Sequence, residues 1–312
     1  MADPIAAIDI GTQTFRLLIA KPEEGHVRTL LTRLENVRLG KDLHRSGVIS
    51  PESMEKGLSV LRKFKKELER LKVNRFAIAG TQVLRQALNA QEFLESTHQI
   101  GLPVRVLSDK QEAAISLLGV KAALDTQLRY PVLVMDIGGG SSEFTLAQED
   151  RLLYSSSFKM GAVTLTQAFV TSHPPDDNDA RKLRQYVEKK LSVLPGQLPE
   201  SPAMVVGVGG TATTLAAIHL RMSHYEPGRV NGLEMTKGLI QDICQSLRVM
   251  TLEQLKGLKG LEEKRADIIY AGTVMTWCAL EIIGAKSMTV SDGGLLLGLL
   301  YTLIHKGEIP DA

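Results

Sequence analysis

PVLVMDIGGGSSEFTLA, residues 131–147, sets an acid, three glycines, two serines and a second acid between two apolar runs. The continuously apolar run 132–135 predicts a β-strand that is covered on both faces. Three successive glycines remove every Cβ from the turn that follows, so backbone N–H groups can approach a ligand closely. An ordinary hairpin turn needs only one or two glycines and no flanking acids. A plain Gly-rich hairpin remains the simpler alternative.

A second stretch, AAIDIGTQTFRLLIA at residues 6–20, repeats this arrangement near the start of the chain. Asp-Ile-Gly occurs at 9–11 and again at 136–138, an offset of 127 residues, each time between apolar runs. Two copies of a strand, an acid–glycine–hydroxyl turn and a second strand predict two similar halves that face each other.

The rest of the chain alternates between helix and strand patterns. Residues 51–72 predict a helix with Ser50 as its N-cap and Pro51 at its first position. Another helix is expected at 111–124 and a polar loop at 171–180. Further strands are expected at 75–80, 104–108, 203–210 and 287–294. With 312 residues, the chain fits about two domains, and this order of elements predicts an α/β architecture with mixed sheets.

Composition excludes several classes of protein. Lys and Arg total 37 against 35 Asp and Glu, a balance that does not fit a nucleic-acid-binding protein. The two cysteines, Cys244 and Cys278, form neither a metal-binding spacing nor a disulfide framework, which indicates a reducing cytoplasm. No signal peptide opens the sequence, and the longest apolar stretch, 293–304, is too short to span a bilayer.

Three turns in which glycine meets a hydroxyl residue follow predicted strands. The third of them opens a helix, where free N–H groups and the helix dipole favour an anion. Together the three turns point to a phosphate chain held between two lobes. The predicted phosphate-binding residues in these turns are Gly11, Thr12, Thr14, Gly138, Gly139, Gly140, Ser141, Gly209, Gly210 and Thr211.

The acids beside these turns predict a metal ion. Asp9 and Asp136 cannot bind phosphate directly because like charges repel, but they can share the shell of Mg²⁺ with phosphate oxygens. Glu143 is a third predicted ligand. The alternatives are that the aspartates cap their own turns and that Glu143 is a solvated strand residue. Arg16 is left open between a phosphate and an internal acid.

Eight motifs, in this order, resemble the exopolyphosphatase and guanosine pentaphosphate phosphohydrolase family in its short, two-domain form. They are IDIGTQTFRL, NVRLGKDLHRSGVISPESMEKGL, GTQVLRQA, LSDKQEA, DIGGGSSEF, VGVGGTATTLAAI, EKRADIIYAG and VSDGG, and they span roughly residues 5–302. The resemblance implies the actin, heat-shock-70 and sugar-kinase fold. Two ribonuclease-H-like lobes with mixed five-stranded sheets would flank a central cleft. The lobes would comprise residues 1–122 plus 296–312, and residues 123–295.

The resemblance also implies residue roles. Glu112, in SDKQEA, matches the general base that activates the attacking water, and Arg85 matches an arginine that holds phosphate. Asp136, the glycines of the long turn and Glu143 match the family's phosphate and metal loop. Without the motif, Glu112 is simply an acid in the first turn of a helix, where the dipole favours it.

Several positions depart from the family pattern. The first acid of the usual pair before Ala is absent, and so are a histidine, two arginines, a second acid and an asparagine. The residues that stand at these positions are Gln111, Asn231, Thr164, Leu296, Leu297 and Gln13. These departures bear on rate and substrate preference more than on the class of reaction.

The sequence therefore predicts a cytoplasmic, Mg²⁺-dependent hydrolase that releases terminal orthophosphate from inorganic polyphosphate or guanosine pentaphosphate. Larger family members carry extra C-terminal domains, and this short form is expected to cut long chains distributively. The alternatives are an ATP-dependent phosphotransferase of the same fold and a catalytically weak sensor that binds an alarmone or polyphosphate. No membrane and no specific nucleic acid are expected as partners, and a homodimer is left open.

Overall fold

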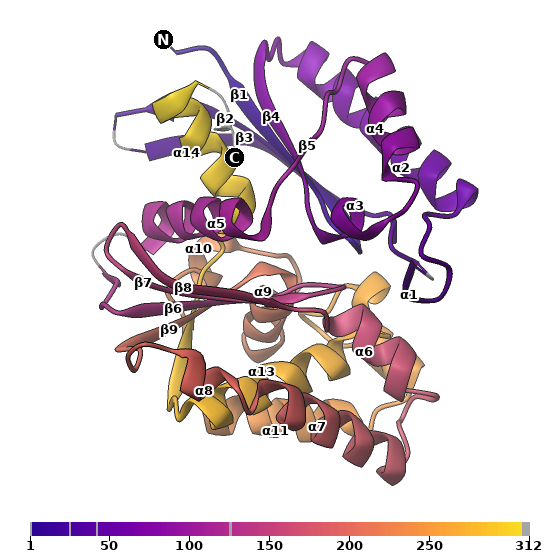
Figure 1. The fold of residues 1–312 in the computed structure, drawn as a ribbon, viewed down its shortest axis with the longest axis vertical. Helices are drawn as coiled ribbons and strands as arrows, with labels where there is room; N and C mark the ends of the chain where they lie inside the picture. The colour runs from indigo at the N-terminus through magenta and orange to yellow at the C-terminus, as the bar shows by residue number, and fades with distance from the viewer. Residues whose placement is uncertain (1, 25, 42, 125–126, 308–312) are drawn as a thin grey trace. The chain divides into compact units, whose positions relative to one another are not determined.

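The computed structural model describes residues 2–24, 26–41, 43–124 and 127–307, and the chain divides into two compact units (Figure 1). Unit 1 contains the described residues up to Ala122 and from Gly293 onward, whereas unit 2 runs from Ala123 to Asp292. The sequence places the return to the first lobe at residue 296, slightly later than the structure does. The part of that expectation that covers 308–312 lies outside the described residues.

Over the described residues, unit 1 contains a five-stranded mixed sheet in the order β3-β2-β1-β4-β5. The central strand β1 pairs antiparallel with β2 and parallel with β4. The predicted strand at 75–80 is confirmed at those residues, but the one at 104–108 shortens to two residues. The strands are β1 (Ile5–Ile10), β2 (Thr14–Glu23), β3 (His26–Asn36), β4 (Arg75–Gly80) and β5 (Arg105–Val106).

The helices of unit 1 follow their sequence signals closely. The longest begins at Pro51, and the Ser50 side chain caps it by accepting a hydrogen bond from Ser53 N, as predicted. The helix expected at 111–124 begins two residues earlier. The helices are α1 (Leu43–Ser46), α2 (Pro51–Arg70), α3 (Gln82–Gln86), α4 (Ala90–Gln99), α5 (Asp109–Leu124, whose last two residues belong to unit 2) and α14 (Leu295–Lys306).

Alternate residues of β1 enter different cores, because successive side chains of a strand point to opposite faces of the sheet. Ile8 and its even-numbered neighbours join the core formed with α2 and α4, which includes Phe64 and Phe93. Ile5 and Ala7 join a smaller core with Leu299 and other residues of α14. Both faces of the sheet of unit 1 are therefore covered by helices, which explains why the strand is apolar throughout.

Unit 2 contains a six-stranded sheet over the described residues, in the order β10-β11-β9-β6-β7-β8. The prediction of five strands is wrong for this unit, because the short segment before α11 pairs antiparallel with β11 and adds an edge strand. Such a three-residue strand carries too little pattern to be recognised in the sequence. The strands are β6 (Val132–Ile137), β7 (Ser142–Gln148), β8 (Arg151–Phe158), β9 (Met204–Val208), β10 (Glu234–Thr236) and β11 (Ser287–Val290).

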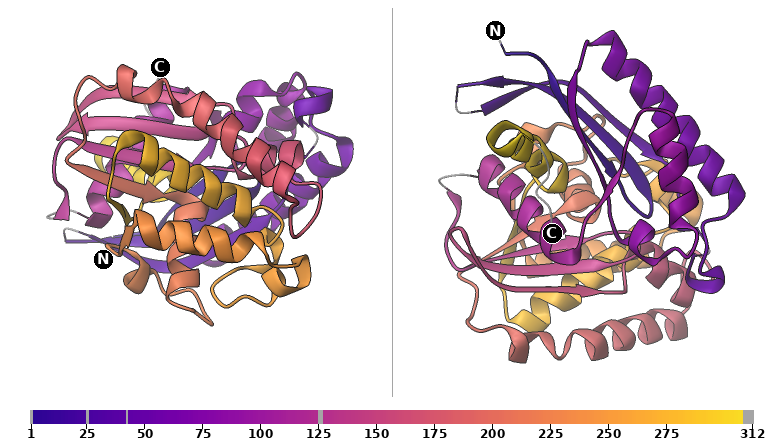
Figure 2. Two further views of the ribbon diagram at one scale, coloured as in Figure 1. Left: turned by 90° about the horizontal axis from the view of Figure 1, so that it is seen from below. Right: turned by 45° about the horizontal axis from the view of Figure 1, so that its top comes forward.

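A layer of helices packs against this sheet. Figures 1 and 2 show α7, α11 and α13 side by side in it. The loop expected at 171–180 is wrong in its second half, because Asp176 accepts a hydrogen bond from Asp179 N (2.7 Å) and so caps α7. The helices of unit 2 are α6 (Ala162–Phe169), α7 (Asp177–Leu191), α8 (Leu194–Gln197), α9 (Gly209–His219), α10 (Pro227–Val230), α11 (Lys237–Arg248), α12 (Leu252–Lys256), η2 (Glu263–Arg265) and α13 (Ile269–Ile283).

The two units repeat one hairpin, as the recurring Asp-Ile-Gly predicts. In unit 1, Gly11 N donates to Thr14 O at 3.0 Å, and in unit 2, Gly138 N donates to Ser141 O at 3.0 Å. The strand pairs on either side also keep the same register. The prediction of two α/β lobes with mixed sheets, built from a duplicated strand–turn–strand, is therefore confirmed.

Candidate active site

In unit 1, Asp9 lies near the end of β1, directly opposite Arg16 on β2. The Asp9 carboxylate is 5% exposed, and its Oδ2 accepts hydrogen bonds from Arg16 Nε (2.9 Å) and Nη2 (2.6 Å). Of the two roles considered for Arg16, the structure places it on an internal acid. The charge of Asp9 is thus balanced within the unit, and its role as a metal ligand stays a prediction.

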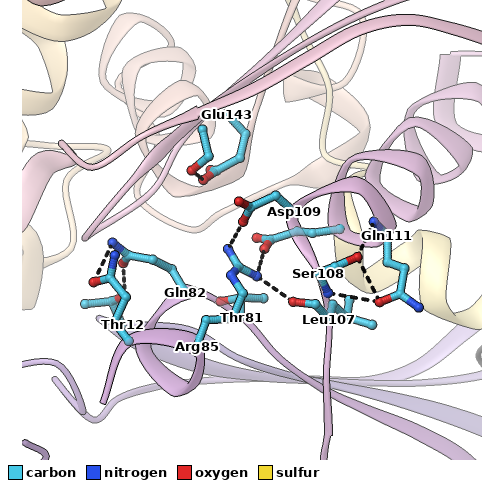
Figure 3. A network of polar contacts seen from close by, with 12 residues as sticks. Thr12, Thr81, Gln82, Arg85, Leu107, Ser108, Asp109, Gln111 and Glu143 are labelled. Atoms are coloured by element: carbon cyan, nitrogen blue, oxygen red, sulfur yellow. Dashed lines mark hydrogen bonds and ion pairs between the residues drawn. The ribbon is translucent and has the colours of Figure 1, made fainter. Parts of the chain in front are cut away.

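The turn after β1 is held by hydrogen bonds within unit 1. The Thr12 hydroxyl donates to Gln82 Oε1 at 3.1 Å (Figure 3), and Thr12 O accepts from Gly40 N at 3.0 Å. The neighbouring Gln13, a departure from the family pattern, is buried and donates to Asn36 Oδ1 at 2.8 Å. Gln13 therefore has a structural role in fixing this turn.

Arg85 and Glu112, which the resemblance assigns to phosphate binding and base catalysis, are in direct contact. Arg85 Nη1 donates to Glu112 Oε2 at 2.7 Å and to Leu107 O at 2.8 Å. Its Nη2 lies 2.6 Å from Asp109 Oδ1 (Figure 3). Asp109 was not predicted as a site residue. Two acids thus share one guanidinium, and the Asp109 side chain, at 57% exposed, is the more accessible of them.

The N-terminus of α5 positions Glu112. Gln111 Oε1 accepts hydrogen bonds from Ser108 N (2.9 Å) and from the Ser108 hydroxyl (3.1 Å), and Gln111 N donates back to Ser108 Oγ at 3.3 Å. This is a capping box, in which a Ser and a Gln three residues later satisfy each other's backbone N–H groups. Gln111 therefore caps the helix whose first turn carries Glu112, where the dipole stabilises a carboxylate.

In unit 2, Asp136 and Glu143 face each other across the strands β6 and β7. Directly opposed side chains have Cβ atoms about 4.5–5.5 Å apart, and like charges in such a pair are destabilising. Glu143 is 9% exposed, and its Oε1 accepts from the Ser157 hydroxyl at 2.8 Å. The Asp136 carboxylate lies against the backbone of Gly209, where a Cβ would collide with it. Asp136 and Glu143 are therefore the two predicted metal ligands that lie opposite each other within one sheet.

The structure gives the three glycines of the long turn a packing role. The first residues of α6 stack on the turn, with Ala162 N donating to Gly138 O (2.9 Å) and Val163 N donating to Gly139 O (2.8 Å). A Cβ on Gly161 would lie 2.6 Å from Gly138 O. Thr164 accepts from Gly161 N at 2.9 Å, so this departure from the family pattern caps α6. One side of the turn is therefore occupied by protein.

The third glycine turn opens α9 at Gly209, whose φ of +75° explains the need for glycine. The Thr211 hydroxyl, 1% exposed, donates to Ile137 O at 2.8 Å, so its side chain joins the turn to β6. Arg265, 9% exposed, places its guanidinium where a Cβ on Gly210 would be. This arginine lies in the motif EKRADIIYAG, and no role was predicted for it.

Two opposed carboxylates in unit 2 are of the ligand type that a magnesium ion takes. Within either unit, the described residues contain no group of three or more His, Cys, Asp or Glu side chains placed to hold a metal. Mg²⁺ is commonly bound by one or two carboxylates, with waters and substrate phosphates completing its shell. Asp136 and Glu143 offer two carboxylates across one strand pair, and Asp9 offers one, which contacts Arg16.

These features define an α/β protein with two Asp-Ile-Gly hairpins, one in each unit, and an acid at a helix N-terminus that is held by an arginine. The Ppx/GppA phosphatase family matches residues 18–307, and the chain belongs to that family. Exopolyphosphatase 2 of Mycobacterium tuberculosis is 29% identical over 316 residues, which cover 96% of this chain and 98% of that protein. A bifunctional 3-dehydroquinate synthase/phosphatase of Fusobacterium nucleatum is 28% identical, but the match covers 46% of that protein. The chain thus spans less than half of this relative.

Solved structures agree with this assignment. The crystal structure of the Aquifex aeolicus member of the Ppx/GppA family is 31% identical, with a TM-score of 0.84 and 98% of each chain covered. An exopolyphosphatase from Cytophaga hutchinsonii is 27% identical, with a TM-score of 0.87 and coverage of 97% and 98%. The predicted family, the predicted class of two α/β lobes with mixed sheets and the prediction of a phosphoanhydride hydrolase are confirmed. None of the described helices is long and apolar enough to cross a membrane.

The structure brings some predicted site residues together and gives others a structural use. Glu112 meets Arg85, and Asp136 meets Glu143, although each pair comes from separate motifs or strands. The hydroxyls of Thr12 and Thr211 serve the fold. Asp109 had a readable signal, since an acid in the first turn of a helix lies beside Glu112, whereas the place of Arg265 had no local signal.

Proposed function

We propose that this protein is a Mg²⁺-dependent hydrolase that removes the terminal phosphate of inorganic polyphosphate or guanosine pentaphosphate. The observation that carries the proposal is Glu112, an acid at the N-terminus of α5 held by Arg85 at 2.7 Å, in a member of a phosphatase family. An exopolyphosphatase of similar length, with 98% of its chain matched, supports polyphosphate as the substrate class.

Glu112 is the proposed general base. As the water oxygen forms a bond to the terminal phosphorus, Glu112 accepts a proton from that water. The phosphoanhydride P–O bond breaks, and the shortened chain leaves as an anion while orthophosphate is released. The bond from Arg85 Nη1 to Glu112 Oε2, at 2.7 Å, orients the carboxylate. The other carboxylate oxygen, Oε1, is the one proposed to take the proton.

Arg85 has a second proposed role toward phosphate. A guanidinium has five N–H donors in a rigid fork and suits phosphate oxygens well. Its exposed partner Asp109, rather than the more buried Glu112, is the one that phosphate can replace. Arg85 would then bridge the substrate and the base and keep both oriented.

Asp136 and Glu143 are the proposed magnesium ligands, with Asp9 as a third candidate. When bound, the metal neutralises charge on the phosphoryl oxygens as the P–O bond breaks. In unit 2, backbone N–H groups at the start of α9 and the guanidinium of Arg265 are the proposed donors to phosphate oxygens. The phosphate roles of Gly11, Gly138, Gly140, Ser141 and Gly209 belong to the same proposal.

Phosphate release from polyphosphate, ATP and guanosine pentaphosphate, measured side by side with Mg²⁺ or with EDTA, tests the proposed function. We expect release from polyphosphate or guanosine pentaphosphate that exceeds release from ATP and stops with EDTA. Transfer from ATP to an acceptor would instead favour a phosphotransferase. Binding of the alarmone or of polyphosphate without turnover would favour a sensor. A cytoplasmic location, a homodimer and the lack of a specific nucleic-acid partner stay predictions.

A further inference from the structure

Asn231 contacts the chain at both places where it passes between the two units. Unit 2 begins at Ala123 and ends at Asp292. The Asn231 side chain donates from Nδ2 to Ala123 O at 2.8 Å and accepts at Oδ1 from Asp292 N at 3.2 Å. The orientation of the amide is dictated by its partners, because a carbonyl only accepts and a backbone N–H only donates. One neutral side chain thus joins the first and last residues of unit 2.

The backbone around Asn231 is itself anchored. Asn231 N donates to Pro227 O at 2.9 Å, which closes the short helix α10. The next residue, Gly232, donates to Val290 O at 2.8 Å, and Val290 N donates back to Leu233 O at 2.8 Å. The segment that carries Asn231 is therefore tied to β11, two residues before the chain leaves unit 2. An anchored amide can resist movement of the residues it binds.

Two neighbours of Asn231 contact the same parts of the chain. The Tyr225 hydroxyl makes a hydrogen bond to the Asp292 carboxylate. Gly232 has a φ of +83°, and a Cβ there would lie 2.8 Å from Gln127 Oε1. The segment 225–232 thus touches residues close to the start and to the end of unit 2.

We infer that Asn231 is a positioning residue. By binding Ala123 and Asp292, it couples the two crossings, the chain segments that join unit 1 to unit 2, so that neither segment moves independently of the other. An amide is well suited to this role, because it offers one donor and one acceptor and carries no charge that would change with pH.

The coupling can be measured as the spread of distances between the two units. Spin labels attached through Glu92→Cys on α4 and Gln245→Cys on α11 place one probe on an exposed position of each unit. The native Cys244 and Cys278 are buried, and burial raises the pKa of each thiol to about 12, so they stay unreactive during labelling. The control variant is Asn178→Ala, which removes an exposed asparagine from α7.

We expect Asn231→Ala to broaden the distance distribution clearly beyond that of the control, at an unchanged melting temperature. Asn231→Asp keeps an acceptor for Asp292 N but loses the donor to Ala123 O, so it should broaden the distribution too. Hydrogen exchange at the Asp292 amide should quicken roughly 2- to 12-fold in Asn231→Ala, the range expected for one lost hydrogen bond, and stay slow in Asn231→Asp.

Two results would overturn the inference. One is a distance distribution in Asn231→Ala that matches Asn178→Ala. The other is broadening in Asn231→Ala but not in Asn231→Asp, because the bond to Ala123 would then not be needed. Neither measurement depends on hydrolysis, so an inactive wild-type protein would contradict the proposed function and leave this test intact.

Discussion

Three features of the structure position Glu112 and surround its carboxylate: the cap of α5, the dipole of α5, and Arg85 from α3. The capping box of Ser108 and Gln111 begins the helix, the dipole of α5 favours its charge, and Arg85 holds one of its oxygens. Gln111, at the position of the first acid in the family pattern, therefore still supports Glu112, the proposed base. Substitution of Glu112 is therefore the most direct test of the proposed reaction.

Glu112→Gln should bind substrate but lose turnover by about 10²- to 10⁴-fold, the usual contribution of a positioned base. The amide keeps the shape of the side chain but cannot take the proton. Steady-state phosphate release, together with binding of labelled polyphosphate, measures both effects. Glu95→Gln, which changes an exposed acid on α4, is the control. Turnover of Glu112→Gln within a few-fold of wild type would remove Glu112 from the mechanism.

Glu143→Gln should shift the Mg²⁺ dependence of activity to higher concentration, because one of two opposed carboxylates no longer contributes charge to the ion. Asp136→Asn should act in the same direction. A Mg²⁺ titration measures this effect, and a melting curve in EDTA shows whether each variant remains folded. An unchanged titration in both variants would show that the metal lies elsewhere.

At the scale of elements, the helices α5 and α14 meet through their backbones in unit 1. A Cβ on Gly119 would collide with Gly294 O, and one on Gly298 would collide with Ile115 O. Glycine is required at these positions because the two helix backbones approach too closely for any side chain. The glycines of the apolar C-terminal stretch therefore allow close helix packing.

Gly298→Ala should lower the stability of the protein by about 1–3 kcal/mol, the usual cost of overpacking a tight contact. Gly238→Ala is the matched control, because nothing lies within 4 Å of a Cβ at that helical position. Thermal melting of both variants checks the expectation. Equal melting temperatures would mean that α5 and α14 separate without cost.

The paired change Leu296→Arg and Leu297→Glu restores the family's charges on α14. Both leucines are half-buried and pack against the apolar core of α14 and β1, so the charges should cost about 1–3 kcal/mol of stability. Leu88→Arg, at a leucine that is 84% exposed, should leave the melting temperature unchanged. A gain in activity with no loss of stability would instead mean that the two positions tolerate charge and serve the reaction.

At the scale of the whole molecule, the near balance of 37 basic and 35 acidic residues limits how a long polyanion can be held. Each basic contact adds salt-dependent affinity, and contacts at several points keep a polymer bound between cleavages. We therefore predict distributive hydrolysis, with a continuous ladder of shortened chains in a gel time course. Full-length polymer present with orthophosphate alone would show processive action and imply a basic track along the protein.

The sequence alone determined the features that depend on residues close together in the chain. The apolar runs around each Asp-Ile-Gly turn predicted the duplicated hairpins, and Ser50 with Pro51 predicted the start of α2. The capping box of Ser108 and Gln111 also had a local signal, a Ser followed three residues later by a Gln, although Gln111 was predicted only as a missing acid. These signals are local, because strand alternation, caps and turns involve neighbours a few residues apart.

Only the tertiary structure decided which distant residues meet. Arg85 contacts Glu112, Arg265 packs on Gly210, and Asn231 binds both ends of unit 2. These pairs are far apart in sequence, and no spacing rule predicts them. They arise because the packing of whole strands and helices fixes the backbone, and a side chain then takes whichever donor or acceptor that packing places within reach.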